Sequence, residues 1–352
     1  MSARVAVVIV NYRTPDLALG AVAALQGERA ALPGLRVVLV DGGSGDGSAE
    51  RLAQGLADTT LAGWATLLPL PINGGFGWAN NQAMQRLLQG DDPPDFIHLL
   101  NPDTIAEPGA VTRLAAVLDA HSQCGAVGSL LLETDGAPSG SAFTFPSACA
   151  ELVRGSRVSA LRRLLHVPPV AYAAGVAGQV DWVTGASVML RATALREAGL
   201  FDTGFFLYFE ELELMSRLTR VGWTIRHEPA SRVRHVGGAA TGVNRSRIVE
   251  ERPTPPPYWF ASRRRMFALT GGRLHATIAS LAWLAGHAFF HTRRLAGRAR
   301  AHIPTRDEGR GLLRHGVLPT QRDLTPAVTR WHDPMNLPPA WMSRTSGVDR
   351  QA

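Results

Sequence analysis

The sequence predicts an α/β protein built on a mostly parallel, twisted sheet with helices on both faces. Four short apolar runs, each long enough for one buried strand, are separated by segments of helical character. The runs cover Val5–Val10, Leu35–Val40, Thr66–Leu70 and Phe96–Leu100. Continuous apolar strands that alternate with helices are typical of a parallel sheet covered on both sides.

Helix signals follow the first three runs. Thr14-Pro15-Asp16 predicts a helix to about Leu25, because Pro is favoured in the first helical turn. The next helices are expected at about 49–57 and from the glycine-rich stretch 73–81 to about Leu88. Each helix has room to return the chain for another parallel strand.

The second half of the chain is less regular. Residues 136–180 are rich in Ser, Gly, Pro and Ala and contain a basic helical piece. Order resumes afterwards, and the patterns predict structure at 180–191, a short helix at 195–199, a helix within 205–220 and a late strand pair at 224–235.

Three regions are expected along the chain. Residues 1–245 form the α/β domain, in which 136–180 is the irregular segment. A Pro-rich stretch at 252–257 precedes a basic helical extension, 246–302, with a long helix near 274–295. The Pro- and Arg-rich tail, 303–352, is expected to be poorly ordered.

Composition limits the class of protein. The 352 residues, 45% hydrophobic and 18% charged, are those of a globular chain with a large core. The two cysteines, Cys124 and Cys149, are too few for a disulfide framework, which favours a reducing compartment. The apolar run at the N-terminus is too short for a signal peptide, so we interpret it as a core strand.

Positive charge is concentrated late in the chain. The formal net charge is +7, yet residues 226–314 alone hold 17 arginines against 5 acids. Such a region favours an anionic partner, either phospholipid or nucleic acid, and nucleic-acid binding lacks a motif. The helix near 274–295 is short for a membrane span. It is expected either to lie in the surface of an anionic membrane or to pack on the catalytic domain or on a second subunit.

Polar residues end three of the first four strands: Asn11, Asp41 and the pair Asn101/Asp103. In a parallel sheet these ends share one edge, where ligands bind. Asp41 suits a base or ribose hydroxyl, and Asn11 with Tyr12 suits a pyrimidine. A carboxylate at Asp103 suits a divalent metal held against a diphosphate.

These motifs also have plain structural interpretations. Residues 41–48 are a good tight turn followed by a helix cap. The glycines around Asn73 are also consistent with a simple bend. Neither a dinucleotide fingerprint nor a phosphate-binding P-loop is present, because the chain lacks the Gly-x-Gly-x-x-Gly motif after the first strand and contains no lysine.

A group of acids follows an aromatic run. Glu210, Glu211 and Glu213 come directly after Phe205–Phe209. Acids here favour a helix N-terminus, but burial beside aromatic rings also raises a carboxyl pKa and creates a general base. His235 ends the last strand and is either a metal contact or an ordinary capping histidine.

Seven segments in one order resemble glycosyltransferase family 2, in particular its bacterial rhamnosyltransferase and galactofuranosyltransferase branch. They contain Val-Ile-Val-Asn-Tyr, Leu-Leu-Asn-Pro-Asp-Thr and Phe-Phe-Leu-Tyr-Phe-Glu-Glu, among others. The segments are 8–12, 40–48, 73–81, 99–104, 180–186, 199–211 and 235–238. The resemblance implies a GT-A fold, a nucleotide-sugar donor, a divalent metal (Mg²⁺ or Mn²⁺) and inversion at the anomeric carbon.

The resemblance also implies residue roles. Donor contacts fall on Asn11, Tyr12, Asp41, Asn73, Asn80, Asn101 and Asp103. The metal contacts fall on Asp103 and His235, and the acceptor and sugar sites border Trp182, Gly185 and Ala186. Glu211 stands where the family usually has the base Asp of a Glu-Asp pair, and Glu210 is the alternative base.

The function expected from this resemblance is a metal-dependent inverting glycosyltransferase of cell-surface polysaccharide synthesis. L-Rhamnose from dTDP-rhamnose is the favoured donor, and a glycan or lipid-linked molecule is the acceptor. A UDP-sugar is the alternative donor, and a catalytically weak sugar-nucleotide-binding or scaffold protein is the alternative function. We expect a cytoplasmic protein, peripheral on the inner face of the membrane through 258–302, that forms a homo-oligomer if this extension packs on a second subunit.

Overall fold

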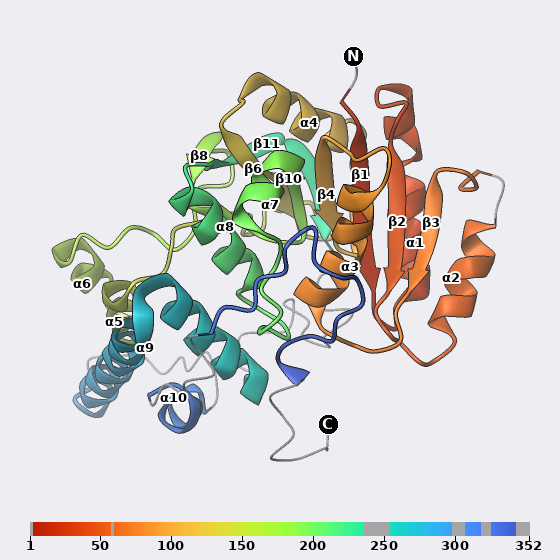
Figure 1. Cartoon of the computed structure of the whole chain (residues 1–352). Coiled ribbons are helices and arrows are strands. Elements are labelled where there is room, and N and C mark those ends of the chain that lie inside the picture. The colour runs from red at the N-terminus through yellow and green to blue at the C-terminus, as the bar shows by residue number, and fades with distance from the viewer. Residues whose placement is uncertain (1–2, 58–59, 236–253, 298–306, 318–324, 343–352) are drawn as a thin grey trace.

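A sheet of nine strands forms the centre of the protein, as the computed structural model shows (Figure 1). The structure describes residues 3–57, 60–235, 254–297, 307–317 and 325–342. The strand order is β3-β2-β1-β4-β10-β6-β11-β5, and β8 pairs with β11. The predicted α/β class with a mostly parallel sheet is confirmed.

The first half of the sheet is parallel, and its elements follow the predicted order. The strands are β1 (Val5–Asn11), β2 (Arg36–Asp41), β3 (Ala65–Pro69) and β4 (Phe96–Leu100), and the helices are α1 (Pro15–Ala24), α2 (Ser48–Leu56) and α3 (Phe76–Gln89), with a short 3₁₀ helix at Gln26–Ala30. The runs of β1 and β4 are almost continuously apolar because both faces of these central strands are buried, whereas β3 at the edge is partly exposed.

The second half of the sheet mixes directions. It contains β5 (Thr104–Ala106), β6 (Cys124–Leu132), β8 (Gly178–Val180), β10 (Ser187–Arg191) and β11 (Thr224–His235), with helices α4 (Ala110–Ala120), α7 (Ala192–Ala198) and α8 (Glu210–Arg220). Strand β10 is antiparallel to both of its neighbours. The predicted strand pair at 224–235 is one strand, in which a bulge after Glu228 shifts the register against β6.

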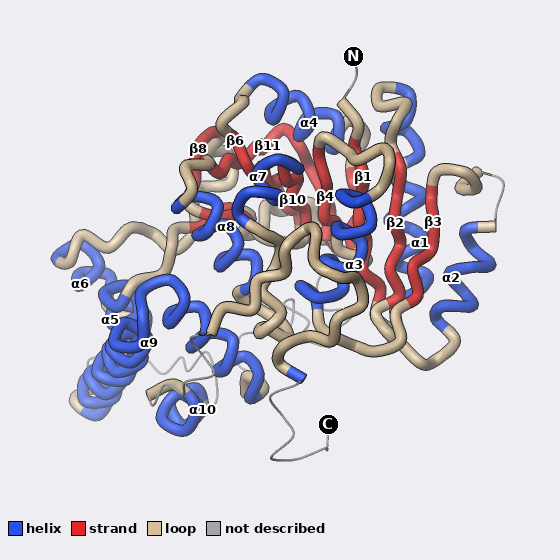
Figure 2. Tube along the Cα trace, viewed as in Figure 1, coloured by secondary structure: helices blue, strands red, loops and turns tan. Residues whose placement is uncertain are grey.

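Helices cover both faces of the sheet, and each face has its own apolar core. Alternate residues of β1 illustrate the division: Val5, Val7 and Ile9 pack towards α1, α2 and α4. Ala6 and Val8 pack towards α3, α7 and α8. Figure 2 shows these helices on either side of the strands.

A helical extension joins the main body through buried ion pairs. It consists of α5 (Ala148–Ser156), α6 (Ser159–Leu164), α9 (Pro257–Leu295) and α10 (Glu308–His315). The strands β7 (Ala142–Phe143) and β9 (Trp182–Val183), which precede α5 and follow α6 in the chain, form a separate two-stranded sheet. Arg263 of α9 and Arg154 of α5 share Glu151, each at 2.8 Å. Arg154 also contacts Glu308 at 2.7 Å, so three helices meet at one ionic cluster.

A second buried ion pair fixes α9 to the sheet domain. The Arg265 guanidinium donates to both carboxylate oxygens of Asp202, at 2.7 and 2.9 Å. Asp202 is fully buried and also accepts from the backbone N–H of Ala327. The helical extension is therefore continuous with the α/β domain rather than separate from it.

Part of the tail expected to be poorly ordered lies in defined contact with α3. Residues 325–342 run along this helix, as the blue segment in Figure 1 shows. Asn81, Gln85 and Gln89 donate side-chain hydrogen bonds to the segment, and Asn336 N–H donates to Gln82. These amides pair with a largely extended backbone, to which a turn at Arg330–Asp333 adds local hydrogen bonds.

The end of this segment reaches the loop before α3. The indole N–H of Trp341 donates to the carbonyl of Gly74 at 2.9 Å, and its ring packs edge-on against Phe206 at 5.0 Å. Residues 325–342, which we call the C-terminal strap, therefore connect the 73–75 loop to the segment that precedes α8.

Candidate active site

The ends of β1 and β2 form one hydrogen-bonded unit. Asn11 and Asp41 are register partners in the parallel pair, and the Asn11 amide donates to the Asp41 carboxylate at 2.8 Å. Ser44 donates to the same carboxylate from its hydroxyl and from its backbone N–H. Residues 41–44 therefore form a tight turn built around the Asp41 carboxylate, and the binding of a nucleoside by this carboxylate stays a prediction.

A cavity of about 420 Å³ opens beside this carboxylate. Its lining contains Asp41 and Glu50, three glycines of the turn and the Pro69–Pro71 segment after β3. The volume lies within the usual range for small-molecule sites. Tyr12 lies next to Asn11 on the chain, with the Arg13 guanidinium 5.1 Å from the centre of its ring.

The structure separates the two asparagines of the glycine-rich stretch. Asn73 accepts from the backbone N–H of Gly75, so it shapes the loop at the start of α3. Asn80 is buried inside α3 and donates to the carbonyl of Phe76, one turn earlier. The amide nitrogen of Asn80 is therefore used within its own helix.

Asp103 and His235 meet although they are 132 positions apart in the sequence. After the Asn-Pro-Asp turn the chain forms β5, which pairs antiparallel with the end of β11, and Thr104 is the register partner of His235. The imidazole Nε2 lies 3.2 Å from the Asp103 carboxylate. Asp103 is 7% exposed and the His235 side chain is 16% exposed.

This pair fits a divalent cation that also takes ligands from a substrate. A carboxylate oxygen and an imidazole nitrogen are ordinary ligands for Mn²⁺, and Mg²⁺ is commonly held by one or two carboxylates together with substrate phosphates. Within the described residues no group of three or more metal-ligating side chains occurs. The two side chains therefore leave most of the coordination to a bound molecule.

The backbone of Gly185 and Ala186 connects the Asn-Pro-Asp turn to the acidic cluster. The N–H of Asn101 donates to the carbonyl of Ala186 at 2.9 Å, because β10 pairs antiparallel with β4. The N–H of Gly185 donates to the Glu211 carboxylate. The segment predicted to border the sugar thus contacts both the donor-side turn and an acid.

Gly185 lies between Phe76 and Glu211. A Cβ there would lie 3.4 Å from the Phe76 ring and 3.7 Å from the Cβ of Glu211. Trp182 lies on the neighbouring strand β9, where it stacks on Phe143 at 4.5 Å and donates to the carbonyl of Thr144. Its indole N–H is therefore used within the protein, and its ring belongs to an aromatic pair.

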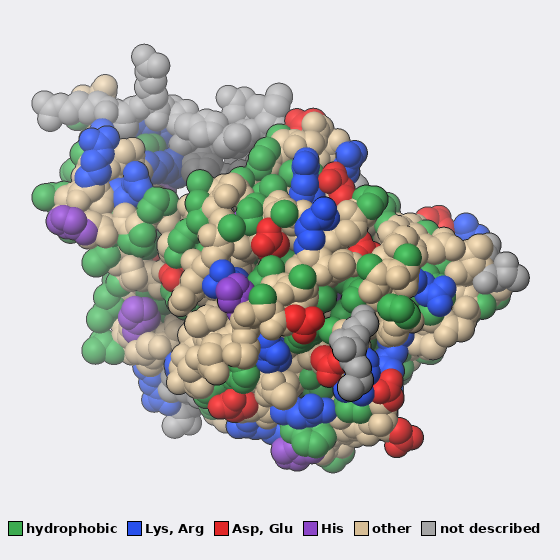
Figure 3. Space-filling view, turned by 90° about the horizontal axis from the view of Figure 1, so that it is seen from above, with side chains coloured by type: hydrophobic (Ala, Val, Ile, Leu, Met, Phe, Trp, Pro, Cys, Tyr) green, Lys and Arg blue, Asp and Glu red, His purple; other side chains and the backbone are tan. Residues whose placement is uncertain are grey.

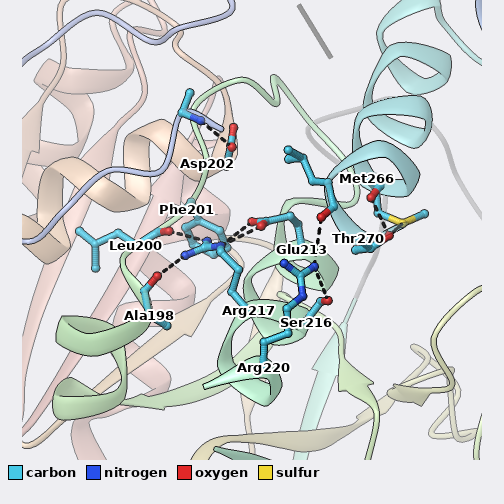
Figure 4. A network of polar contacts seen from close by, with 12 residues as sticks. Ala198, Leu200, Phe201, Asp202, Glu213, Ser216, Arg217, Arg220, Met266 and Thr270 are labelled. Carbon is cyan, nitrogen blue, oxygen red and sulfur yellow. Dashed lines mark hydrogen bonds and ion pairs between the residues drawn. The ribbon is translucent and has the colours of Figure 1, made fainter. Parts of the chain in front are cut away.

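The three acids of α8 have three different surroundings. Glu213 forms a buried ion pair with Arg217, whose Nε donates to both carboxylate oxygens at 2.8 and 2.9 Å, and the other two guanidinium nitrogens donate to the carbonyls of Ala198 and Leu200 (Figure 4). This acid therefore orients the arginine that holds the loop after α7. Among the described residues, neither Glu210 nor Glu211 has such an arginine partner.

Glu210 and Glu211 point to different sides of the α8 N-terminus. The Cβ of Glu210 lies 3.8 Å from where a Cβ on Gly77 would be, so Glu210 faces α3. It is 2% exposed, accepts from the N–H of Tyr208, and has one oxygen without a partner among the described residues. Glu211 faces Gly185 and is partly exposed.

Burial raises the pKa of both carboxyls. For Glu210 desolvation dominates and the neighbouring Glu211 charge adds to it, so its pKa lies well above the ordinary value. Desolvation also raises the pKa of Glu211, while the Gly185 N–H opposes the increase. A partly exposed carboxylate with a raised pKa is suited to accept a proton.

The backbone before α8 is held in a sparsely populated conformation. Tyr208 and Phe209 both have positive φ angles, of 72° and 70°. Such strain in non-glycine residues is concentrated at functional sites. Phe206 and Tyr208 in this segment pack against Tyr258 of α9, a contact between distant parts of the chain that the sequence did not indicate.

A family profile described as "Glycosyltransferase like family 2" matches residues 3–272. A protein of Mycobacterium tuberculosis (strain CDC 1551 / Oshkosh), named N-acetylglucosaminyl-diphospho-decaprenol L-rhamnosyltransferase, is 30% identical over 218 residues, which cover 58% of this chain and 68% of the relative. The same name and values apply to a protein of strain ATCC 25618 / H37Rv.

Two solved structures share the fold. The mannosyltransferase PcManGT from Pyrobaculum calidifontis, in complex with GDP-Man and Mn²⁺, has a TM-score of 0.53 and 15% identity, with 90% of this chain and 80% of that chain covered. GalNAc-T7 with UDP, GalNAc and Mn²⁺ has a TM-score of 0.53 and 14% identity, with 89% and 54% covered.

Proposed function

The chain belongs to glycosyltransferase family 2 and has the GT-A fold, and from this premise we propose that it transfers L-rhamnose from dTDP-rhamnose to a lipid-linked glycan acceptor with inversion. The name of the 30% identical relative, a rhamnosyltransferase that acts on a polyprenyl-linked sugar, supports both the sugar and the class of acceptor. The pathway that this reaction serves is cell-surface polysaccharide synthesis.

One observation carries the proposal: Gly185 and Ala186 contact both Glu211 and the Asn-Pro-Asp turn through their backbone. A sugar held beside this backbone lies between a diphosphate on the Asp103 side and a hydroxyl group on the Glu211 side. That arrangement suits a single displacement at the anomeric carbon.

The donor would lie along the ends of β1, β2 and β4. The nucleoside would enter the cavity beside Asp41, with Asn11 holding that carboxylate in place and Tyr12 beside it. Asn101 would contact the donor close to its diphosphate. A UDP-sugar is the alternative donor, because uridine presents a pyrimidine base and a ribose 2′-hydroxyl group, both of which can hydrogen-bond to Asp41.

Asp103 and His235 would hold Mg²⁺ or Mn²⁺ against the diphosphate, and the bound ion would offset the negative charge that develops on the leaving group. Glu211 would remove the proton from the acceptor hydroxyl as its oxygen attacks, so that the carboxylate ends protonated and the nucleoside diphosphate departs. The buried Glu210 beside it would limit water on one side of the base.

Transfer assays with nucleotide sugars test this proposal. We expect transfer from dTDP-rhamnose in the presence of Mg²⁺ or Mn²⁺, and a loss of at least 100-fold in Asp103→Ala. Asp119→Ala, which removes an exposed carboxylate on α4, is the matched control. Binding of nucleotide sugars without transfer from any of them would favour the alternative, a scaffold protein of the same fold.

A further inference from the structure

The second part of α9 is an amphipathic helix whose apolar side faces outward. Gly272, with a φ of 86°, breaks α9 into two helical parts. Beyond the break, Leu274, Ile278, Leu281, Phe289 and Leu295 are 73%, 45%, 49%, 50% and 89% exposed. Their spacing, close to multiples of 3.6, puts these side chains on one stripe along the helix. Residues 274–295 thus present what we call the apolar stripe.

Three polar residues of the same helix, Thr277, Ser280 and His287, face the protein. Thr277 donates to the carbonyl of Val317 after α10, and Ser280 is buried and accepts from Arg263. His287 stacks on the buried Trp283 at 4.6 Å. These polar groups are therefore used in contacts within the protein.

Two neighbouring helices occupy the inner sides of α9 and leave the stripe uncovered by described residues. A Cβ on Gly155 of α5 would lie 2.3 Å from the carbonyl of Trp283, and one on Gly286 would lie 2.3 Å from that of Leu152. The two helices therefore touch through their backbones. On another side, a Cβ on Gly316 at the end of α10 would lie 3.1 Å from the Ser280 hydroxyl.

Positive charge flanks the stripe and negative charge is missing from the helix. Arg273 and Arg294, near its two ends, are exposed, and residues 257–295 contain no Asp or Glu. The other arginines of this helix are not equivalent, since Arg263 and Arg265 are buried in ion pairs. Only part of the basic composition of the extension is therefore available to a partner.

The neighbouring helix α6 has a similar composition. Leu164 is 73% exposed, and Arg163 beside it is exposed. In Figure 1, α6 and α9 lie at the same end of the molecule, and Figure 3 shows hydrophobic side chains along that end. The described helices include none long and apolar enough to cross a membrane.

We propose that the apolar stripe on α9 is a membrane-docking surface that lies in the headgroup region of an anionic bilayer. A helix with an apolar face and flanking arginines binds such an interface by burying the apolar side chains while the guanidinium groups remain at the phosphates. The inference rests on the proposed function and deepens it, because docking would bring the site to a lipid-linked acceptor.

Vesicle flotation tests the surface without any enzyme assay. The full chain is mixed with vesicles of phosphatidylcholine alone or with 30% phosphatidylglycerol. We expect strong binding to the anionic vesicles only, with binding at least tenfold weaker in the double variant Ile278→Ser/Leu281→Ser. The double variant Leu17→Ser/Val221→Ser, which changes exposed apolar residues on α1 and after α8, should bind like the wild type.

Charge gives a second readout. Replacing Arg273 and Arg294 by Gln should weaken anionic binding about fivefold for each arginine, and added salt should have a similar effect. Equal binding of the wild type and Ile278→Ser/Leu281→Ser would overturn the proposal. A dimer in light scattering that this double variant converts to a monomer, without vesicle binding by either protein, would also overturn it and assign the stripe to a second copy of the chain.

The outcome for the surface is separable from that for the proposed function. Transfer to a short-chain, water-soluble analogue of the acceptor needs the site alone. Activity on this analogue without vesicle binding would reject the docking surface and retain the proposed function. Vesicle binding without transfer from any donor would retain the docking surface and reject the proposed function.

Discussion

Replacing Glu211 by Gln tests the assignment of the base. Glutamine has the same shape, and its carbonyl oxygen still accepts from the Gly185 N–H, so the geometry of the site should be retained. It cannot accept a proton at neutral pH. A positioned general base contributes about 10²–10⁴ in rate, so we expect kcat to fall by that factor while the donor Kd stays within about threefold of the wild-type value.

The pH dependence of kcat tests the same assignment. The base works only when ionised, and burial raises the pKa of Glu211 above the ordinary value. Activity should therefore be lost as the pH falls through this raised pKa, which places the acid limb of kcat above pH 4.5. Stopped assays from pH 4.5 to 9 with saturating donor would measure this limb.

A comparison with Glu210→Gln decides between the two acids. Glu210 faces α3 and Glu211 faces Gly185, so the larger loss of kcat should belong to Glu211→Gln. Undiminished turnover in Glu211→Gln, or a much greater loss in Glu210→Gln, would refute the geometric reasoning. Asp119→Asn, at an exposed position on α4, controls for the loss of one carboxylate.

Three further predictions concern stability and the C-terminal strap. Asp202→Asn leaves the buried Arg265 guanidinium without its counter-charge, and we expect the free energy of unfolding in urea to fall by about 3–5 kcal/mol; a loss below 1 kcal/mol would contradict the importance of this pair. Trp341→Ala should raise the donor KM by severalfold, because the strap holds the 73–75 loop, and Trp341→Phe, which keeps the ring contact, should raise it less. Equal KM values in the wild type and both variants would argue against a role of the strap in donor binding. Glu210→Gln should raise the Tm at pH 7.5, since the raised pKa of Glu210 makes its ionised form unfavourable in the folded state. The gain in Tm should shrink as the pH falls towards 4.5, and thermal shift at both pH values measures it. A lower Tm of the variant at pH 7.5 would count against a raised pKa at Glu210.

The sequence was sufficient for the parallel half of the sheet. The runs that became β1, β2 and β4 are largely buried, so their apolar character was continuous, and polar residues marked their ends. The same logic brought Asn11 and Asp41 together, because parallel neighbours end at the same edge. These are local patterns combined with one rule of topology.

Long-range pairing explains what the sequence left out. Residue patterns alone did not pair Asp103 with His235, because β5, whose pairing with the end of β11 brings them together, has only three residues; the family resemblance gave both as metal contacts. The strap was missed because the amides of α3 resemble an ordinary polar helix surface when their partner lies about 245 residues away. The outward direction of the apolar stripe likewise depends on long-range contacts, because α5 and the end of α10 pack against the other sides of α9.

Transfer of rhamnose is the most direct test of the whole account. Purified protein, dTDP-rhamnose and a lipid-linked sugar acceptor with Mn²⁺ should give a product one deoxyhexose heavier by mass spectrometry. The account predicts that this product forms with the wild type and falls at least 100-fold in both Asp103→Ala and Glu211→Gln. Product formation at the wild-type rate in both variants would contradict it.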